Sequence, residues 1–212
     1  MKIIDVTHTI SPRMPVYPGT EPPVFIDGCT IDNDGFVEKK MTMYSHTGTH
    51  MDAPAHIIKG AKTLDELPAD HFFGKALVLN LAGTDREYIK IDALKPYQDL
   101  IKGNDFVLLK TGWSQFWGSE KYFNNYPILS SEAASWLSGF DLKGIGSDTI
   151  SPDEIETPDF PIHKMFLSRD IVIIENLTNL DALPLNQFTF SCFPLKIQRA
   201  DGSPVRAVAM VN

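Results

Sequence analysis

The most informative segment of this chain is rich in histidine and reads His46-Thr47-Gly48-Thr49-His50-Met51-Asp52-Ala53-Pro54-Ala55-His56. It places three of the six histidines of the chain, and one aspartate, within eleven residues. Neutral imidazole and carboxylate groups are the ligands that borderline divalent ions such as zinc and manganese prefer. The stretch therefore predicts a metal site that uses His46, His50 and Asp52.

Neither regular backbone geometry gathers these side chains. On an extended strand, positions 46, 50, 52 and 56 share one face, but a rise of about 3.3 Å per residue separates His46 from His50 by roughly 13 Å. On a helix, His46 and His50 become neighbours while Asp52 and His56 turn to the opposite side. We therefore expect the segment to fold back on itself, with Gly48 as the turning point.

Alternatives to metal binding stay open on the residues alone. Histidines close to serine and threonine often lie in hydrogen-bonded loops that bind nothing. Glu175 ends an apolar run, where a buried carboxylate needs a cation or several hydrogen bonds, and a metal or an arginine would serve equally. His163 follows Pro161 and Ile162 and is either a ligand or a loop histidine.

Composition restricts the class of protein. The 212 residues are 43% hydrophobic and 22% charged, with a net charge of −8, which disfavours nucleic acids and anionic membrane surfaces as partners. No segment approaches the roughly 20 apolar residues that span a bilayer, and the first residues do not resemble a signal peptide. We expect a cytoplasmic protein of a single domain, residues 1–212, whose two cysteines, Cys29 and Cys192, are buried free thiols.

Short apolar runs bounded by turn residues predict an α/β fold, a mixed β-sheet with short helices. The four clear strands are expected at residues 75–81, 105–110, 171–175 and 205–211. A helix is expected over 132–137, capped by Ser130 or Ser131, and another begins at Ile91 and is limited by Pro96. The proline-rich segment 11–23 is expected to be an ordered arm or loop.

Several other polar and aromatic residues are assigned no chemistry. The run 148–151 offers Asp, Thr and Ser together, but no nucleophile elbow surrounds it, so a polar turn that lines the pocket is the favoured interpretation. His8 and His71 are interpreted as surface or packing residues. Trp113, Phe116 and Trp117 are expected to pack in the core or at a subunit contact.

The stretch 46–56 matches the pattern H-x-G-T-H-x-D-x-P-x-H of the cyclase family of metal-dependent hydrolases, which includes bacterial kynurenine formamidases and isatin hydrolases. The resemblance covers the full length of the chain. It extends to Pro15-Val16-Tyr17-Pro18-Gly19, Leu108-Leu109-Lys110-Thr111-Gly112-Trp113, Gly146-Ser147-Asp148-Thr149 and Ser203-Pro204-Val205-Arg206-Ala207.

The resemblance implies a swivelling β/β/α fold, assembly into homodimers or homotetramers, and one or two metal ions per chain, zinc or alternatively manganese. The first ion would be held by His46, His50 and Asp52. Asp52 would bridge to a second ion held also by His163 and Glu175.

The resemblance also implies roles in catalysis and substrate binding. His56 would donate and accept protons, and Tyr17 would contact the substrate. Tyr17 stands where kynurenine formamidases carry a substrate-stacking tryptophan, a departure that puts formylkynurenine in doubt as the substrate.

Residues and resemblance together predict an enzyme that uses metal-activated water to cleave the C–N bond of a small amide, formamide or cyclic amide. N-formylkynurenine is one candidate substrate. The alternatives are lactone hydrolysis or dehydration on the same centre, and a metal-dependent binding protein without catalysis.

Overall fold

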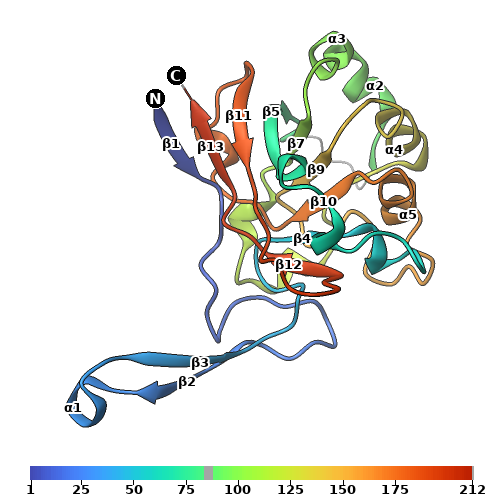
Figure 1. The fold of residues 1–212 in the computed structure, drawn as a ribbon. Coiled ribbons are helices and arrows are strands. Elements are labelled where there is room, and N and C mark those ends of the chain that lie inside the picture. The colour runs from blue at the N-terminus through green and yellow to red at the C-terminus, as the bar shows by residue number, and fades with distance from the viewer. Residues whose placement is uncertain (84–87, 212) are drawn as a thin grey trace.

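One mixed sheet organises the computed structural model, which describes residues 1–83 and 88–211 (Figure 1). Nine strands of the described chain follow the order β1-β13-β11-β5-β7-β9-β10-β4-β12. Strands β5, β7, β9 and β10 run parallel, and their neighbours on both flanks are antiparallel. The bounds are β1 (Lys2–Asp5), β4 (His50–Asp52), β5 (Phe73–Asn80), β7 (Phe106–Lys110), β9 (Gly144–Ser147), β10 (Val172–Glu175), β11 (Phe188–Ser191), β12 (Gly202–Pro204) and β13 (Val208–Val211).

The remaining elements are short. Two further pairs of strands are β2 (Val24–Cys29) with β3 (Glu38–Thr42), and β6 (Tyr88–Ile89) with β8 (Ile128–Leu129). The α-helices are α1 (Ile31–Asp34), α2 (Ile91–Leu94), α3 (Gln98–Ile101), α4 (Ser131–Leu137) and α5 (Pro161–Leu167). Single 3₁₀ turns lie at Pro54–His56, Leu64–Glu66, Ala69–Phe72, Lys95–Tyr97, Trp113–Phe116, Glu120–Phe123 and Leu180–Ala182.

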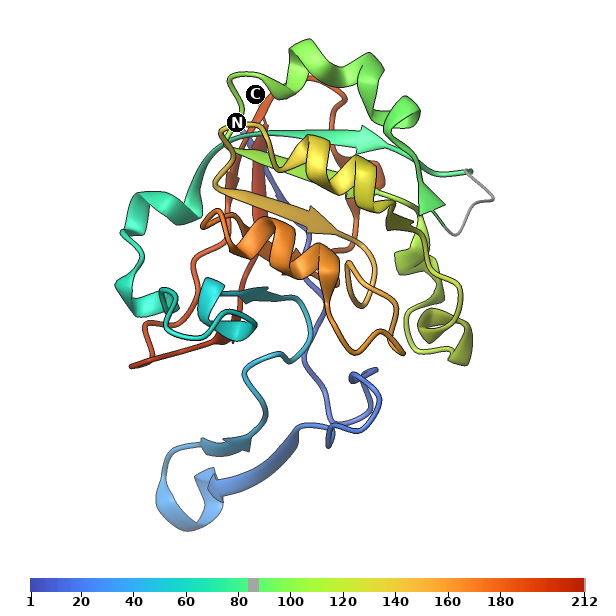
Figure 2. The same cartoon turned by 90° about the vertical axis from the view of Figure 1, so that its right-hand side faces the viewer.

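The alternation of side chains along the central strands builds two cores. Leu77 and Leu79 of β5 point to the face that helices α2, α4 and α5 cover, as Figure 2 shows for α4 and α5. Val78, between them, points to the other face, where the sheet curls and Phe190 of β11 packs over it. Since both faces of the parallel strands are buried, their sequences read as continuous apolar runs rather than as alternating patterns.

The expected fold class, a mixed sheet with short helices, is confirmed, and the boundaries shift by a few residues. The run predicted at 75–81 forms β5 from Phe73 to Asn80. The run predicted at 205–211 is a strand only from Val208, because Val205 makes an isolated bridge to Pro194 instead. Ser130 caps α4 by accepting a hydrogen bond from the backbone N–H of Ala133.

Of two expectations about single residues, the one about Pro96 is confirmed and the one about Cys29 is wrong. The α-helix that starts at Ile91 ends at Leu94, before Pro96, and Pro96 occupies the first turn of the 3₁₀ stretch that follows, where its missing N–H costs nothing. Cys29 is not buried like Cys192. It lies half-exposed at the end of β2, and both cysteines are free thiols.

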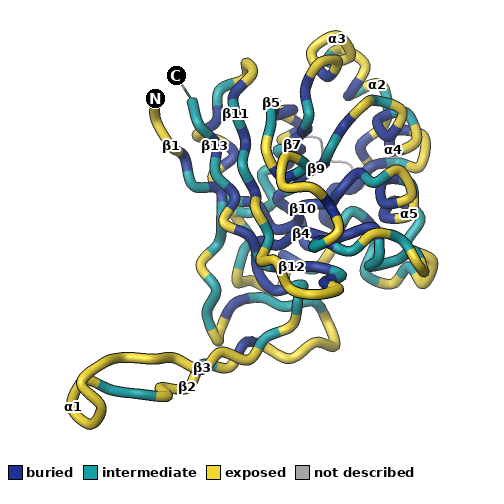
Figure 3. Tube along the Cα trace, in the orientation of Figure 1, coloured by how far each residue is buried: buried dark blue, intermediate teal, exposed yellow. Residues whose placement is uncertain are grey.

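Strands β2 and β3 form an arm, residues 24–42, that projects from the rest of the molecule with α1 at its tip (Figure 3). Its apolar residues face solvent: Val24, Ile26, Ile31, Phe36, Val37 and Met41 are each more than half exposed. A two-stranded ribbon with no core of its own is only marginally stable in water. The arm is therefore the part of the fold that is least able to stay folded without further contacts.

The aromatic residues that follow β7 pack in the core. Trp113, Phe116 and Trp117 surround the fully buried Tyr122, whose backbone carbonyl accepts a hydrogen bond from the Trp113 indole. His8 stacks on Trp117 with ring centroids 3.9 Å apart. The interpretation of His8 as a packing residue is therefore confirmed.

Within residues 1–83 and 88–211, no helix combines the length and the apolar character that crossing a lipid bilayer needs.

Burial of His8 should make stability depend on pH. Desolvation lowers the pKa of this imidazole from 6.5 to about 4, so the stacked ring stays neutral where an unfolded histidine would be charged. Its contribution to stability is therefore present above pH 6.5 and is lost as the pH falls towards 4. The free energy of unfolding is measured by urea titration, with a chelator present, at pH values between 6.5 and 4. Over this range wild type should lose about 1–3 kcal/mol more than the variant His8→Phe, which keeps a stacked ring but does not titrate. Equal losses in the two proteins would contradict this account.

Candidate metal centre

The segment 46–56 folds back at Gly48, as expected. Gly48 has a φ of +67°, a conformation that a residue with a side chain adopts only with strain. Its carbonyl accepts hydrogen bonds from Nδ1 of His50 at 2.8 Å and from the Asn176 side chain at 2.9 Å. Tyr122 donates in turn to the Asn176 side-chain oxygen at 2.7 Å, so the aromatic core holds the turn in place.

Strand pairing decides which residues meet the segment. Strand β4 lies between β10 and β12, with His50 opposite Glu175 and Asp52 opposite Gly202. The fold-back brings His46 beside them, and the 3₁₀ turn Pro54–His56 returns His56 to within 4.0 Å of the His46 ring, measured between centroids.

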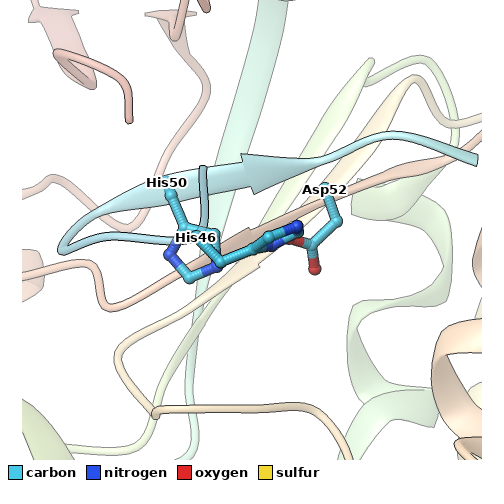
Figure 4. A group of neighbouring side chains, drawn as sticks. All are labelled: His46, His50 and Asp52. Carbon is cyan, nitrogen blue, oxygen red and sulfur yellow. The ribbon is translucent and has the colours of Figure 1, made fainter. Parts of the chain in front are cut away.

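A first set of three ligand atoms comes from His46, His50 and Asp52, all within 4.8 Å of one another (Figure 4). Nδ1 of His46 is 2.7 Å from Oδ1 of Asp52, and Nε2 of His50 is 3.4 Å from the same oxygen. Nitrogen atoms of two imidazoles and an oxygen of one carboxylate thus converge on one point, which neither a straight strand nor a helix would achieve.

A second set comes from Asp52, His163 and Glu175. Nε2 of His163 lies 3.5 Å from Oε1 of Glu175 and 3.7 Å from Oδ2 of Asp52. Helix α5 carries His163, and Asp153 fixes the start of that helix by accepting hydrogen bonds from the backbone N–H groups of Ile162 and His163. Asp52 belongs to both sets, with one oxygen directed to each.

These residues fit a divalent cation. Asp52 is 1% exposed and Glu175 5% exposed, so both carboxylates are out of water. Oδ2 of Asp52 is buried and has no hydrogen-bond partner within residues 1–83 and 88–211. A buried carboxylate oxygen without a donor is costly, and a cation between the two sets would satisfy it.

The carboxylates set the proton affinities of the three histidines. Burial alone would lower the pKa of His46, but the charge of Asp52 and the hydrogen bonds to Asp201 and Asp52 raise it to about 9. Hydrogen bonds and charges of nearby carboxylates likewise overcome burial and raise the pKa of His50 and of His163 to about 10. A cation that binds here must therefore displace protons.

His56 differs from these histidines. Burial, with the charges of His46 and His163 added, lowers its pKa below 6.5 against the opposing pull of Asp52. The ring is therefore neutral at pH 7 and free to accept a proton.

The two sets lie on the floor of a cavity of about 300 Å³. Part of its lining is apolar and is formed by Pro15, Val16, Tyr17, Ile150 and Phe160. The Tyr17 hydroxyl donates to the backbone carbonyl of Ile155 at 3.1 Å, which leaves its ring as part of the wall. The cavity has the size and the mixed lining of a site for a small organic molecule.

The run 148–151 is a polar turn at this cavity, as interpreted from the sequence. Asp148 is buried and accepts hydrogen bonds from the backbone N–H groups of Thr111 and Gly112 and from the Thr111 hydroxyl. Ile150 and Ser151 line the cavity.

Sequence reasoning missed two acidic residues at the site. Asp153 accepts a hydrogen bond from Nδ1 of His163 at 2.7 Å, and Asp201 accepts one from Nε2 of His46 at 3.1 Å. Asp201 stands just before the stretch 203–207 that carries part of the family resemblance, which was the available indication. Asp153 is ten residues from His163 in a loop, and no spacing rule connects them.

A model of the family described as putative cyclase matches residues 4–154. The chain belongs to the cyclase family. Residues 4–154 of this cyclase-family chain include the segment 46–56 and strands β4 to β9, whereas His163 and Glu175 lie beyond the match.

Relatives with names extend the similarity over the whole chain. A kynurenine formamidase from Bacillus cytotoxicus is 30% identical over 206 residues, which are 97% of this chain and 95% of the relative. Among solved structures, isatin hydrolase A from Labrenzia aggregata superposes with a TM-score of 0.90 at 28% identity, covering 99% of this chain and 93% of the other.

A third relative carries the metal dependence in its description. A predicted metal-dependent hydrolase from Bacillus stearothermophilus superposes with a TM-score of 0.82 at 29% identity, over 98% of this chain and 97% of the other. The predictions of a cyclase-family member and of a metal-dependent hydrolase are confirmed by these similarities and by the ligand sets.

Substitutions of Asp52 and of His163 should distinguish the carboxylate that both ligand sets share from a ligand of the second set alone. Asp52→Ala should leave no bound metal, since both sets lose an oxygen. His163→Ala should remove only the ion of the second set. Asp170→Asn, at a half-exposed carboxylate that pairs with Lys62, should bind as wild type does. Metal per chain is measured by elemental analysis after zinc loading and dialysis. Wild-type metal content in Asp52→Ala would refute the shared site.

Proposed function

We propose that this chain hydrolyses the C–N bond of a small amide, formamide or cyclic amide at a metal centre held by His46, His50, Asp52, His163 and Glu175. The observation that carries the proposal is the position of Asp52, whose two oxygens serve two ligand sets on the floor of a small cavity with an apolar wall. Zinc is the proposed metal, with manganese as the alternative and one or two ions per chain.

The bound metal would polarise the substrate carbonyl and lower the pKa of water. The side chains supply the remaining chemistry. His56, neutral at pH 7 and beside the ligand histidines, takes up a proton and delivers it to the departing nitrogen. Tyr17 and Phe160, which belong to the apolar wall, contact the apolar part of the substrate.

The substrate class follows from the cavity and from the names of the relatives. A volume of about 300 Å³ admits a single small ring system, and its wall suits an aromatic group. One relative is called a kynurenine formamidase and another an isatin hydrolase, so an aryl formamide such as N-formylkynurenine and a cyclic aryl amide are the two candidates.

The alternative activities are lactone hydrolysis, dehydration and metal-dependent binding without turnover. The position of His56 favours catalysis, because a binding protein has no use for a proton carrier beside its metal ligands. The cytoplasmic location and the single domain expected from the sequence stay predictions.

We propose further that the chain forms a homodimer or homotetramer through the arm. Its apolar side chains are exposed on both faces of the ribbon, which is typical of a surface that a partner covers. Both ends of the arm lead into the cavity, since Tyr17 and Thr20 precede β2 and Tyr44 and Ser45 follow β3, and all four line it. A second copy of this chain seated on the arm would therefore hold two walls of the cavity in place.

The proposed reaction is tested with zinc-loaded protein, N-formylkynurenine and isatin. Wild type should hydrolyse at least one of them. His56→Ala should keep its metal while turnover falls about 10²–10⁴-fold, the usual contribution of a positioned acid–base group. Metal binding without turnover of either substrate would restrict the proposal to other amides, and normal turnover by His56→Ala would refute the role of that histidine.

The proposed assembly is tested by light scattering after size exclusion. Wild type should have the mass of two or four chains, and the double variant Phe36→Ser, Val37→Ser should dissociate and lose turnover. Leu100→Ser, which changes an equally exposed side chain on α3, should do neither. A monomeric wild type would contradict the proposal.

A further inference from the structure

Each of the three ligand histidines has its second ring nitrogen directed at an oxygen of the chain. Nδ1 of His50 faces the Gly48 carbonyl at 2.8 Å, Nδ1 of His163 faces Asp153 at 2.7 Å, and Nε2 of His46 faces Asp201 at 3.1 Å. A carbonyl or an ionised carboxylate only accepts hydrogen bonds, so the nitrogen that faces it must carry the proton. Without a cation the other nitrogen of each ring also lies near a carboxylate, that of Asp52 or Glu175, so both nitrogens can be protonated.

A cation bound by the ligand sets would displace the proton from the remaining nitrogen of each ring and bind its lone pair, while the outer acceptor keeps the proton on the nitrogen that faces it. For His50 and His163 the remaining nitrogen is Nε2, and for His46 it is Nδ1, the atom that lies 2.7 Å from Asp52. These are the atoms that face the two ligand sets. An outer acceptor that fixes a histidine in this way also makes it a better ligand.

Asp201 is the most exposed of the three acceptors, and its position is nevertheless well determined. Its backbone carbonyl accepts a hydrogen bond from the Ala53 N–H at 2.8 Å, which ties it to the metal-binding segment. The next residue is Gly202, where an added Cβ would lie 2.5 Å from Cε1 of His46. The His46 ring therefore packs directly on the backbone that presents Asp201.

The alternative role for Asp201 is direct ligation. His46, His56 and Asp201 also form a group that would accommodate a cation, and Oδ2 of Asp201 lies 3.8 Å from Nδ1 of His56. The Asp201 side chain is half exposed, however, and its carboxylate already accepts the hydrogen bond from His46, whereas Asp52 has a buried oxygen without a donor in the described chain. The shared site at Asp52 is therefore the place where a cation satisfies an otherwise unpaired atom.

We propose that Asp201 is a positioning residue that fixes His46 with Nε2 protonated and Nδ1 directed at the metal, so that it raises metal affinity without ligating the ion. The inference rests on the metal centre proposed above and names a residue that neither the family pattern nor the ligand sets around Asp52 include. Asp201 does this for His46 as Asp153 does for His163.

The test is zinc affinity, measured by competition with a chromophoric chelator. Asp201→Asn should bind zinc about 10–100-fold more weakly than wild type at unchanged ions per chain, and Asp201→Glu should recover part of the loss. Asp170→Asn, which removes a carboxylate of similar exposure, should bind as wild type does. Thermal unfolding with a chelator present should be the same for wild type and Asp201→Asn, since the hydrogen bond orients a ligand rather than supports the fold.

The outcomes separate this inference from the proposed function. If wild type binds no zinc, the metal centre is wrong and the inference falls with it. If wild type binds zinc and Asp201→Asn binds it equally well, only the inference is wrong. Fewer ions per chain in Asp201→Asn would show that Asp201 is a ligand, and lower stability with the chelator present would show a structural role. Either result would overturn the proposal.

Discussion

The site depends on a charged carboxylate kept out of water. Asp52 is almost fully buried. Burial alone would raise its pKa, but the charge of His46 and hydrogen bonds from His46 and His50 hold that pKa well below the usual range. Its second oxygen has no donor in the part of the chain that is described. A buried anion of this kind needs a positive partner, and the arrangement of imidazoles and carboxylates around Asp52 provides the place for one.

The pairing of β4 with its two neighbouring strands places the residues that surround Asp52. Strand β4 has only three residues, His50 to Asp52, but it lies between β10 and β12, so its register sets two contacts at once. One neighbour brings Glu175 opposite His50, and the other brings Gly202 and hence Asp201 beside Asp52. A shift of one residue in either pairing would turn the ligands to the other face of the sheet.

The scaffold and the cavity wall are linked through side chains far from the ligands. Tyr122, at the centre of the aromatic core, reaches Asn176, and Asn176 holds the carbonyl of Gly48. On the other side, the exposed arm begins and ends in residues that line the cavity. The turn at Gly48 is therefore held by hydrogen bonds within the chain, whereas the loops at the base of the arm adjoin an exposed two-stranded ribbon.

The family, the mixed α/β class and the first group of candidate ligands could be predicted from the sequence. Segment 46–56 contains those candidate ligands, and because neither a strand nor a helix would bring them together, a turn at Gly48 was the remaining possibility. The sequence also placed β5, β7 and β10 within two residues, since their apolar runs are strong local patterns, but it did not find β9 (Gly144–Ser147), which lies between β7 and β10. It left Glu175 and His163 undecided between metal and other partners, and it missed Asp153 and Asp201. These depend on strand register and on contacts between residues as much as 155 positions apart, which no local pattern encodes. That both candidate ligand sets include Asp52 is visible only in the fold, because three separate segments must meet at this one buried carboxylate.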